Sequence, residues 1–114
     1  MADDCIFCSI ASGTQETTFV YEDDTVVAFH DIQPKAKVHV LIIPREHLAS
    51  LNETSADHVS LLGHLTSVAA RLAKELDVAE GGYKLVVNTG AHAGQLVPHL
   101  HFHLLGGEPV LGVT

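Results

Sequence analysis

The chain has 114 residues, with six basic against 14 acidic side chains and a formal net charge of −8 when its nine histidines are neutral. This length suits one small domain with a single hydrophobic core. The acidic balance argues against a nucleic acid or an anionic membrane surface as partner, because both recruit basic proteins. The N-terminus lacks a basic, apolar leader, and no apolar run reaches the roughly 20 residues of a membrane span. We therefore expect a cytoplasmic protein, in which its cysteines are thiols or metal ligands rather than a disulfide.

The first half of the chain predicts a short helix and a set of strands. Residues 5–11 favour a short turn or helix. Residues 19–22 and 26–30 are typical of two strands joined by an acidic turn, which together form a hairpin. Residues 38–43 are the clearest strand by composition. We expect Pro44 to end that strand, because proline cannot donate to a strand ladder.

The second half predicts one long helix followed by two more strands. Residues 54–57 resemble a capping box, with Thr54 or Ser55 as the N-cap. Apolar residues then recur at spacings of three and four, which indicates one buried helical stripe of Leu62, Leu65, Ala69, Leu72 and Leu76. Residues 83–88 favour a strand, and a glycine-containing loop at 89–97 leads into the run 99–105. This order indicates an antiparallel α+β domain.

The run 99–105 alternates histidine with large apolar residues. On an extended strand, His99, His101 and His103 share one face, and the apolar residues between them share the other. One face can then be buried in a core while the other presents three imidazoles. The pattern alone is consistent with a metal site or with a catalytic strand.

Several segments together resemble the histidine triad (HIT) superfamily. The alternating histidines match its signature, and the glycines at 106–107 are typical of its Hint-like branch. Residues 29–32 resemble its nucleoside-pocket segment. Residues 39–45 resemble its strand that ends in Ile-Pro, and residues 86–95 resemble its phosphate-side loop. The resemblance implies a single HIT domain over 1–114, with an antiparallel five-stranded sheet, one long helix and a short N-terminal helix. It also implies a homodimer with one continuous sheet, and His39 as a hydrogen-bonded fourth histidine.

The resemblance further implies a purine nucleoside 5′-phosphoramidate hydrolase or nucleotidyl transferase. A neutral imidazole is a good nucleophile near pH 7, and the resemblance makes His101 the residue that forms a covalent nucleotidyl intermediate. His103 would bind a phosphate oxygen, stabilise charge and assist the leaving amine, and His99 completes the catalytic triad. Asp31 would accept hydrogen bonds from the ribose hydroxyls, and the base would lie between Ile6, Phe7, Ile10, Phe29, His30 and Ile32.

The phosphate would be held by His101, His103 and the loop residues Asn88, Gly94, Gln95, Leu96 and Val97. Leu96 departs from the animal Hint pattern, which has a serine at this position that contacts the phosphate and the leaving group. Leucine offers only its backbone there, which puts activation of the leaving group in question.

The pair Cys5 and Cys8 is a second candidate site. A redox role would require a preceding strand, for which position 5 leaves no room. Zinc-containing relatives in the superfamily use such a pair with a histidine after the Ile-Pro strand and the first histidine of the triad. The resemblance therefore implies a structural Zn²⁺ held by Cys5, Cys8, His47 and His99, which would withdraw His99 from proton chemistry. The alternative is two reduced surface cysteines beside a solvated His47.

Other functions fit the same residues. Members of other HIT branches hydrolyse dinucleoside polyphosphates, and a purine mononucleotide or phosphoramidate could also be bound by a regulatory module with little turnover. Leu96 favours the second of these alternatives, because it removes a polar contact to the leaving group. A catalytic metal on the histidine strand is a third alternative.

Overall fold

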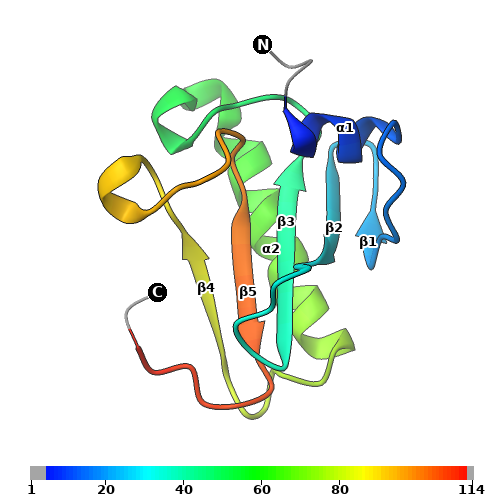
Figure 1. The fold of residues 1–114 in the computed structure, drawn as a ribbon, viewed down its shortest axis with the longest axis vertical. Coiled ribbons are helices and arrows are strands. Elements are labelled where there is room, and N and C mark those ends of the chain that lie inside the picture. The colour runs from blue at the N-terminus through cyan, green and yellow to red at the C-terminus, as the bar shows by residue number, and fades with distance from the viewer. Residues whose placement is uncertain (1–4, 113–114) are drawn as a thin grey trace.

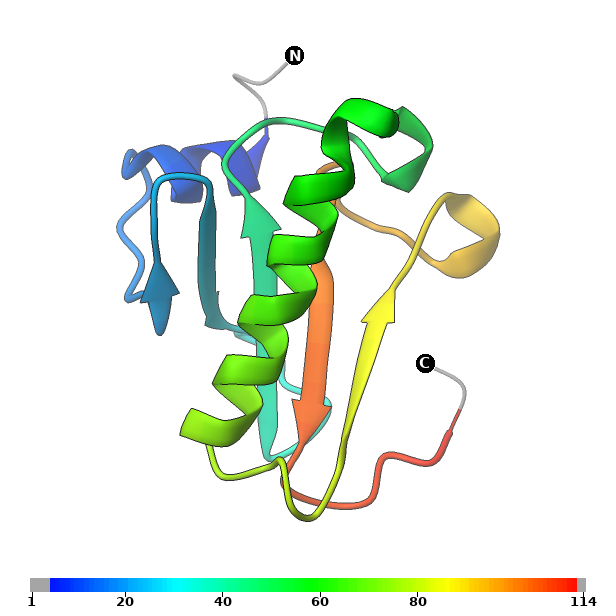
Figure 2. The same ribbon diagram turned by 180° about the vertical axis from the view of Figure 1, so that it is seen from behind.

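The computed structural model describes residues 5–112 as a five-stranded antiparallel sheet with a long helix across one face (Figures 1 and 2). The strand order is β1-β2-β3-β5-β4, so β1 and β4 form the edges. The helices and strands are α1 (Ile6–Ser12), β1 (Tyr21–Glu22), β2 (Val26–His30), β3 (Val38–Pro44), α2 (Val59–Glu75), β4 (Tyr83–Val87) and β5 (Phe102–Gly106), with single 3₁₀ turns at Leu51–Glu53, Ala56–His58 and Ala91–Ala93. The predicted α+β class, sheet and two helices are confirmed.

Helix α2 covers the main core. Its buried residues pack on the sheet face that carries Val40, Ile42 and Leu104. The predicted apolar stripe is confirmed, with Leu62 and Leu76 half-buried at its ends. The buried positions on the helix are Leu65, Val68, Ala69, Leu72 and Ala73.

Ser55, one of the two predicted N-cap residues, is the N-cap in the structure, and the capping box therefore spans residues 55–58 rather than 54–57. The Ser55 hydroxyl accepts from the amide of Asp57, and the amide of Ser55 donates to the ring of His58. A histidine thus takes the place of the acidic partner, and the box begins the 3₁₀ turn that leads into α2.

The predicted histidine strand begins later than the alternation suggests. Strand β5 starts at Phe102, so His99 and His101 precede it. The backbone amide of His99 donates to Val97, and that of Leu100 donates to Leu48, at 2.8 and 2.6 Å. Because these two amides donate to carbonyls of loops, the segment before Phe102 does not join the hydrogen-bonded ladder of the sheet.

The opposite face of the sheet is only partly covered. Helix α1 lies over one end of β2 and β3, where Phe7 and Ile10 pack against Phe29, Leu41 and Ile43. Strand alternation places His39 and Leu41 of β3 on this face, and Leu41 is paired with His103 of β5. The uncovered part of the face therefore carries the histidines.

Gly106 allows the chain segment after α2 to approach β5. A Cβ atom at Gly106 would lie 2.9 Å from Cβ of the buried Val78. Within residues 5–112, the helices are too short or too polar to cross a bilayer.

Candidate active site

A cavity of about 440 Å³ lies on the sheet face opposite α2. Strands β3, β4 and β5 form its floor, and the loop after β4 forms one wall. Among the described residues, those that line it are Phe7, Asp31, Gln33, Lys35, His39, Leu41, Val86, Asn88, Ala93, Gly94, Leu96, Val97, His101, His103 and Leu105.

His101 is held at the edge of this cavity in one orientation. Its Nδ1 lies 2.7 Å from the carbonyl oxygen of His99, and the ring of Phe7 packs edge-on against it at 5.2 Å between centroids. Because a carbonyl can only accept a hydrogen bond, the neutral His101 ring carries its proton on Nδ1. Nε2 is therefore unprotonated, as a nucleophile requires.

His103 lies beside His101 with its ring centroid 4.9 Å away. Burial, together with the neighbouring His101 and His39, lowers the pKa of His103 to about 4. His103 is thus a neutral imidazole at pH 7. Its Nδ1 lies 3.0 Å from Nε2 of the buried His39, so the predicted hydrogen-bonded fourth histidine is confirmed.

The loop between β4 and β5 is held by its own side chains. The amide of Asn88 donates to the carbonyl of Ala93, and the backbone amide of Gly90 donates to the side-chain oxygen of Gln95. The Gln95 nitrogen donates to the carbonyls of Ala49 and Val97. Gln95 therefore braces the loop and is not among the cavity-lining residues, unlike the other four loop residues that were predicted to contact phosphate.

Leu96 stands at the rim of the cavity with its side chain 92% exposed. A side chain this exposed does not pack into the hydrophobic core. It leaves an apolar surface at the cavity mouth, where the animal Hint pattern would present a hydroxyl.

A second hollow of about 540 Å³ lies beside the first, between α1 and β2. Its lining includes all six residues predicted to contact the base, and Phe7 belongs to both hollows. Asp31 lines the histidine cavity next to it. Apart from Gln95, the residues predicted to contact base, ribose and phosphate therefore line two adjoining hollows that share Phe7.

Sequence reasoning missed several lining residues. Gln33 and Lys35 line the histidine cavity, and residues 15–18 line the second hollow. Lys35 is the one lysine or arginine among the described residues of the histidine cavity, where it brings positive charge close to His103. Its position after the nucleoside-pocket segment was the available signal.

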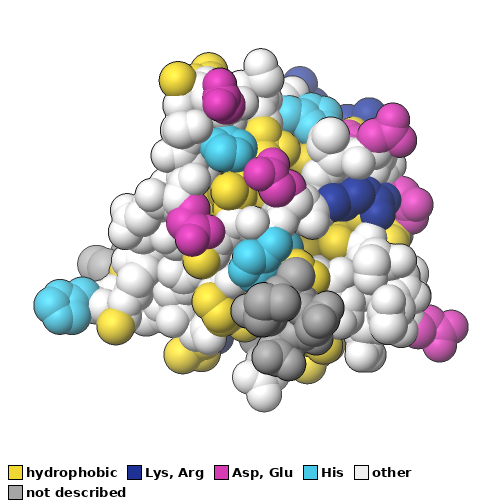
Figure 3. All heavy atoms as spheres, turned by 90° about the horizontal axis from the view of Figure 1, so that it is seen from above, with side chains coloured by type: hydrophobic (Ala, Val, Ile, Leu, Met, Phe, Trp, Pro, Cys, Tyr) yellow, Lys and Arg dark blue, Asp and Glu magenta, His cyan; other side chains and the backbone are white. Residues whose placement is uncertain are grey.

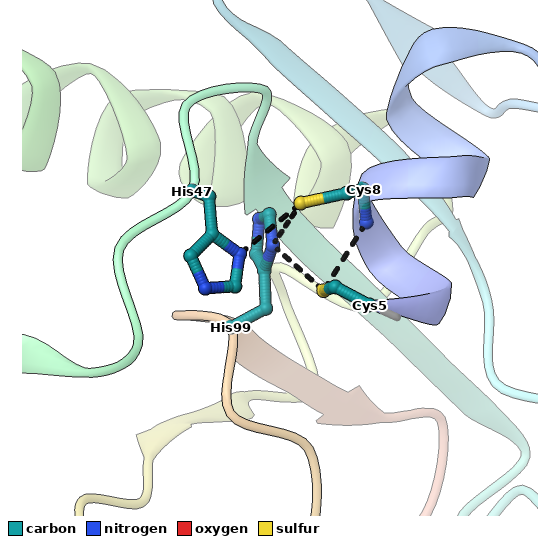
Figure 4. Close-up of side chains that lie close together, drawn as sticks. All are labelled: Cys5, Cys8, His47 and His99. Carbon is teal, nitrogen blue, oxygen red and sulfur yellow. Dashed lines mark hydrogen bonds between the residues drawn. The ribbon is translucent and has the colours of Figure 1, made fainter. Parts of the chain in front are cut away.

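The four predicted zinc ligands converge, as Figure 4 shows. Their ligand atoms all lie within 4.8 Å of one another, with Cys5 Sγ 3.3 Å from His99 Nδ1 and Cys8 Sγ 3.1 Å from His47 Nδ1. A tetrahedral zinc site with ordinary bond lengths has a sulfur–nitrogen edge of roughly 3.6 Å. The cluster therefore has nearly the dimensions and the donor set of a structural zinc site.

A hydrogen bond fixes His99 in the tautomer that a zinc ligand needs. Its Nε2 donates to the carbonyl of Pro44 at 2.8 Å, so the neutral ring leaves Nδ1 unprotonated toward the thiols. Burial lowers the pKa of His99, which also favours the neutral ligand form. Burial and the neighbouring Cys5 raise the pKa of the Cys8 thiol to about 11, so a bound metal would have to displace its proton.

The cluster joins three segments that are far apart in the sequence. Cys5 and Cys8 belong to the start of α1, His47 follows β3, and His99 precedes β5.

Figure 3 shows this end of the molecule from above, with histidine and acidic side chains among apolar ones and few basic groups. In the histidine cavity, an anionic ligand would depend on backbone amides, imidazoles and the single Lys35 rather than on a basic patch.

The antiparallel sheet and its row of histidines define a protein of the histidine triad class. The chain belongs to the HIT family, because the HIT domain model matches residues 12–110. It is 46% identical over 110 residues to the purine nucleoside phosphoramidase of Escherichia coli strain K12, covering 96% of this chain and 92% of that protein.

Solved structures agree with this assignment. A HIT family hydrolase from Legionella pneumophila superposes with a TM-score of 0.91 at 43% identity, covering 93% of this chain and 95% of the other. A histidine triad protein from Clostridium difficile superposes with a TM-score of 0.92 at 39% identity, covering 97% and 96%.

Proposed function

We propose that this protein is a purine nucleoside 5′-phosphoramidate hydrolase that acts through a nucleotidyl intermediate on His101. The main supporting observation is the 2.7 Å hydrogen bond from His101 Nδ1 to the His99 carbonyl, which leaves Nε2 unprotonated beside a cavity of nucleotide size. The similarity to a purine nucleoside phosphoramidase and to HIT family hydrolases supports a hydrolase that acts on nucleotides.

The proposed reaction has two displacements at phosphorus. His101 Nε2 attacks the phosphorus atom, the P–N bond breaks, and the amine leaves with the electron pair and takes up a proton from water. Water then attacks the nucleotidyl-histidine and gives a proton to the hydroxide left by the first step, so that the nucleoside monophosphate is released and the neutral ring is restored. His103, Lys35 and the loop amides would stabilise the charge that develops on the phosphoryl oxygens.

The base would lie in the hollow between α1 and β2, and the ribose hydroxyls would donate to Asp31. A purine ring is flat and apolar on its faces, which suits Phe7, Phe29 and Ile10. Ile6, His30 and the highly exposed Ile32 would cover its outer edge.

We also propose a structural Zn²⁺ at Cys5, Cys8, His47 and His99. The ion would tie α1 to the segments before β5 and after β3, and the reaction would not involve it directly. Thiols that bind zinc must stay reduced, which a cytoplasmic location would ensure. If free zinc exceeds its dissociation constant 1,000-fold, binding stabilises the fold by about 4 kcal/mol, or roughly 15 °C in melting temperature.

Metal analysis of the purified protein, with thermal unfolding before and after chelation, tests the zinc site. We expect one zinc per chain, its loss in a Cys8→Ser variant, and a lower melting temperature without the metal. A protein that retains no zinc when zinc is supplied, or that melts at the same temperature with and without it, would contradict the site.

A homodimer with a continuous sheet is the proposed assembly. Strand β4 lies at one edge of the sheet, and Leu85, Val86 and Val87 on it are only half-buried within the described chain. Pairing of two such edges would extend the sheet. Light scattering after gel filtration should give twice the mass of the chain, and a monomer at micromolar concentration would refute this assembly.

Steady-state kinetics tests the function. Adenosine 5′-phosphoramidate should be hydrolysed to AMP, and a His101→Gly variant should release none. Faster turnover of a dinucleoside polyphosphate would favour the activity of other HIT branches. Tight AMP binding without turnover of either substrate would indicate a regulatory binding module, and activity lost to a chelator without loss of folding would indicate a catalytic metal.

Leu96 offers a separate test of leaving-group activation. A Leu96→Ser variant should keep its stability within about 0.5 kcal/mol, because the side chain is exposed. We expect it to turn over phosphoramidates faster, since a hydroxyl at the cavity rim can donate to the phosphate. An unchanged or lower rate would show that position 96 has no part in activating the leaving group.

A further inference from the structure

The buried His39 is fixed in one protonation pattern by a backbone amide. The amide nitrogen of Lys35 donates to His39 Nδ1 at 3.0 Å, and the side chain of His39 is almost fully enclosed. A backbone N–H can only donate, so Nδ1 of His39 must be the acceptor. The neutral ring therefore carries its proton on Nε2.

That proton determines the state of the next histidine. His39 Nε2 lies 3.0 Å from His103 Nδ1, and since Nε2 of His39 is the donor, Nδ1 of His103 must accept. A neutral His103 ring then carries its own proton on Nε2. The direction of donation runs from the Lys35 amide through His39 to His103, a residue that lines the cavity.

We propose that His39 is a positioning residue that fixes His103 as a neutral Nε2–H donor toward the bound phosphoryl group. The inference deepens the proposed function, since its catalytic consequence rests on that function, whereas the tautomer itself does not. His101 and His103 then have opposite polarity although their rings lie 4.9 Å apart. One offers the lone pair that attacks phosphorus, and the other offers a hydrogen bond to an oxygen of the same group.

The arrangement makes His103 a hydrogen-bond donor and not a net source of protons. If neutral His103 gave up its Nε2 proton, it would need another at Nδ1 from His39. His39 cannot be resupplied in turn, because the Lys35 amide is not an acid. The leaving amine therefore takes its proton from a source other than His103, and His103 stays neutral.

The proton on His39 Nε2 disfavours a metal ion at Asp31, His39 and His103. Their ligand atoms lie within 4.8 Å of one another, and the Asp31 carboxylate is 3.5 Å from His39 Nε2. A metal would need the Nε2 lone pair of His39, whereas the Lys35 amide places a proton on that nitrogen. Asp31 is better described as a nearby carboxylate whose negative charge faces the N–H group of His39.

The test uses the zinc-loaded full chain labelled with ¹⁵N, and two substitutions of His39. His39→Phe keeps the shape of the ring but removes the donor, and His39→Gln keeps an N–H group near the position of Nε2. Long-range ¹H–¹⁵N spectra at pH 7 report which ring nitrogen of His103 is protonated, with a His103→Gln variant for assignment. Calorimetric titration with AMP measures the affinity of each protein.

We expect the Nε2–H form of His103 in the wild type and in His39→Gln, and a mixture of both forms in His39→Phe. AMP should bind about tenfold more weakly to His39→Phe, with the glutamine variant within about threefold of the wild type. A wild-type His103 protonated on Nδ1, or an unchanged Nε2–H form in His39→Phe, would overturn the proposal. If His39→Phe does not fold, the tautomer of His103 in the wild type still tests the proposal, because a proton on Nδ1 would refute it.

The same data separate this proposal from the proposed function. An Nε2–H tautomer that depends on His39, in a protein that hydrolyses no phosphoramidate, would support the positioning role and refute the activity. A Nδ1–H tautomer in an active phosphoramidase would refute the positioning role alone.

Discussion

Phe7 links the two hollows to the nucleophile, so its removal tests both packing and function. Its side chain is only 7% exposed, and its ring packs edge-on against His101, Phe29 and His99, with centroids at 5.2, 5.7 and 6.0 Å. Truncation of a buried phenylalanine to alanine costs about 3–5 kcal/mol, from lost transfer free energy and the cavity left behind. We expect Phe7→Ala to lie within this range.

Urea unfolding gives the free energy for the wild type, Phe7→Ala and the matched variant Phe7→Leu. Leucine refills most of the volume, so that variant should lose less than about 1.5 kcal/mol. Both variants lose the edge-on contact that restrains His101, and both should release AMP from a phosphoramidate more slowly. A loss below about 1 kcal/mol in Phe7→Ala would refute the packing argument.

Two further predictions concern stability. The folded pKa of His103, about 4 against an unfolded value of 6.5, means that the unfolded chain binds the extra proton between these pH values. Stability should therefore fall as pH drops from 6.5 to 4, by ~1–2 kcal/mol once partial exposure is allowed for, and urea unfolding should show a weaker pH dependence in His103→Gln. Gly106→Ala should destabilise by about 1–3 kcal/mol because of the contact with Val78. The control Gly63→Ala, in open space on α2, should stabilise by about 0.5–1 kcal/mol, and the reverse order in thermal unfolding would contradict both assignments.

Periodicity predicted the fold because each element buries a face that the sequence already marks. The stripe from Leu62 to Leu76 lies against the sheet, and the run 38–43 makes up all of β3 except its last residue, Pro44. The ends of elements were less predictable, since they depend on tertiary hydrogen bonds. The Leu100 amide bonds to Leu48, 52 positions away, and nothing local in the sequence signals that β5 begins only at Phe102.

The parts of the candidate site that depend on side-chain identity could be predicted from the sequence. The parts that depend on backbone hydrogen bonds could not. The spacing of Cys5 and Cys8, with the resemblance, identified a cluster that the fold brings together. By contrast, the amide of Lys35 that orients His39 has no sequence signature, because every residue except proline has such an amide. The hydrogen bonds by which the Gln95 side chain holds its own loop likewise have no local sequence signature, and its contact with phosphate stays a prediction.

Intact-protein mass spectrometry after rapid mixing with adenosine 5′-phosphoramidate tests the central claim most directly. Wild-type protein should show a transient added mass of one nucleotidyl group, which peptide mapping should place on His101, together with release of AMP. The His101→Gly variant should show neither. Hydrolysis by the wild type with no adduct at any mixing time, or an adduct on another residue, would contradict a covalent mechanism at His101.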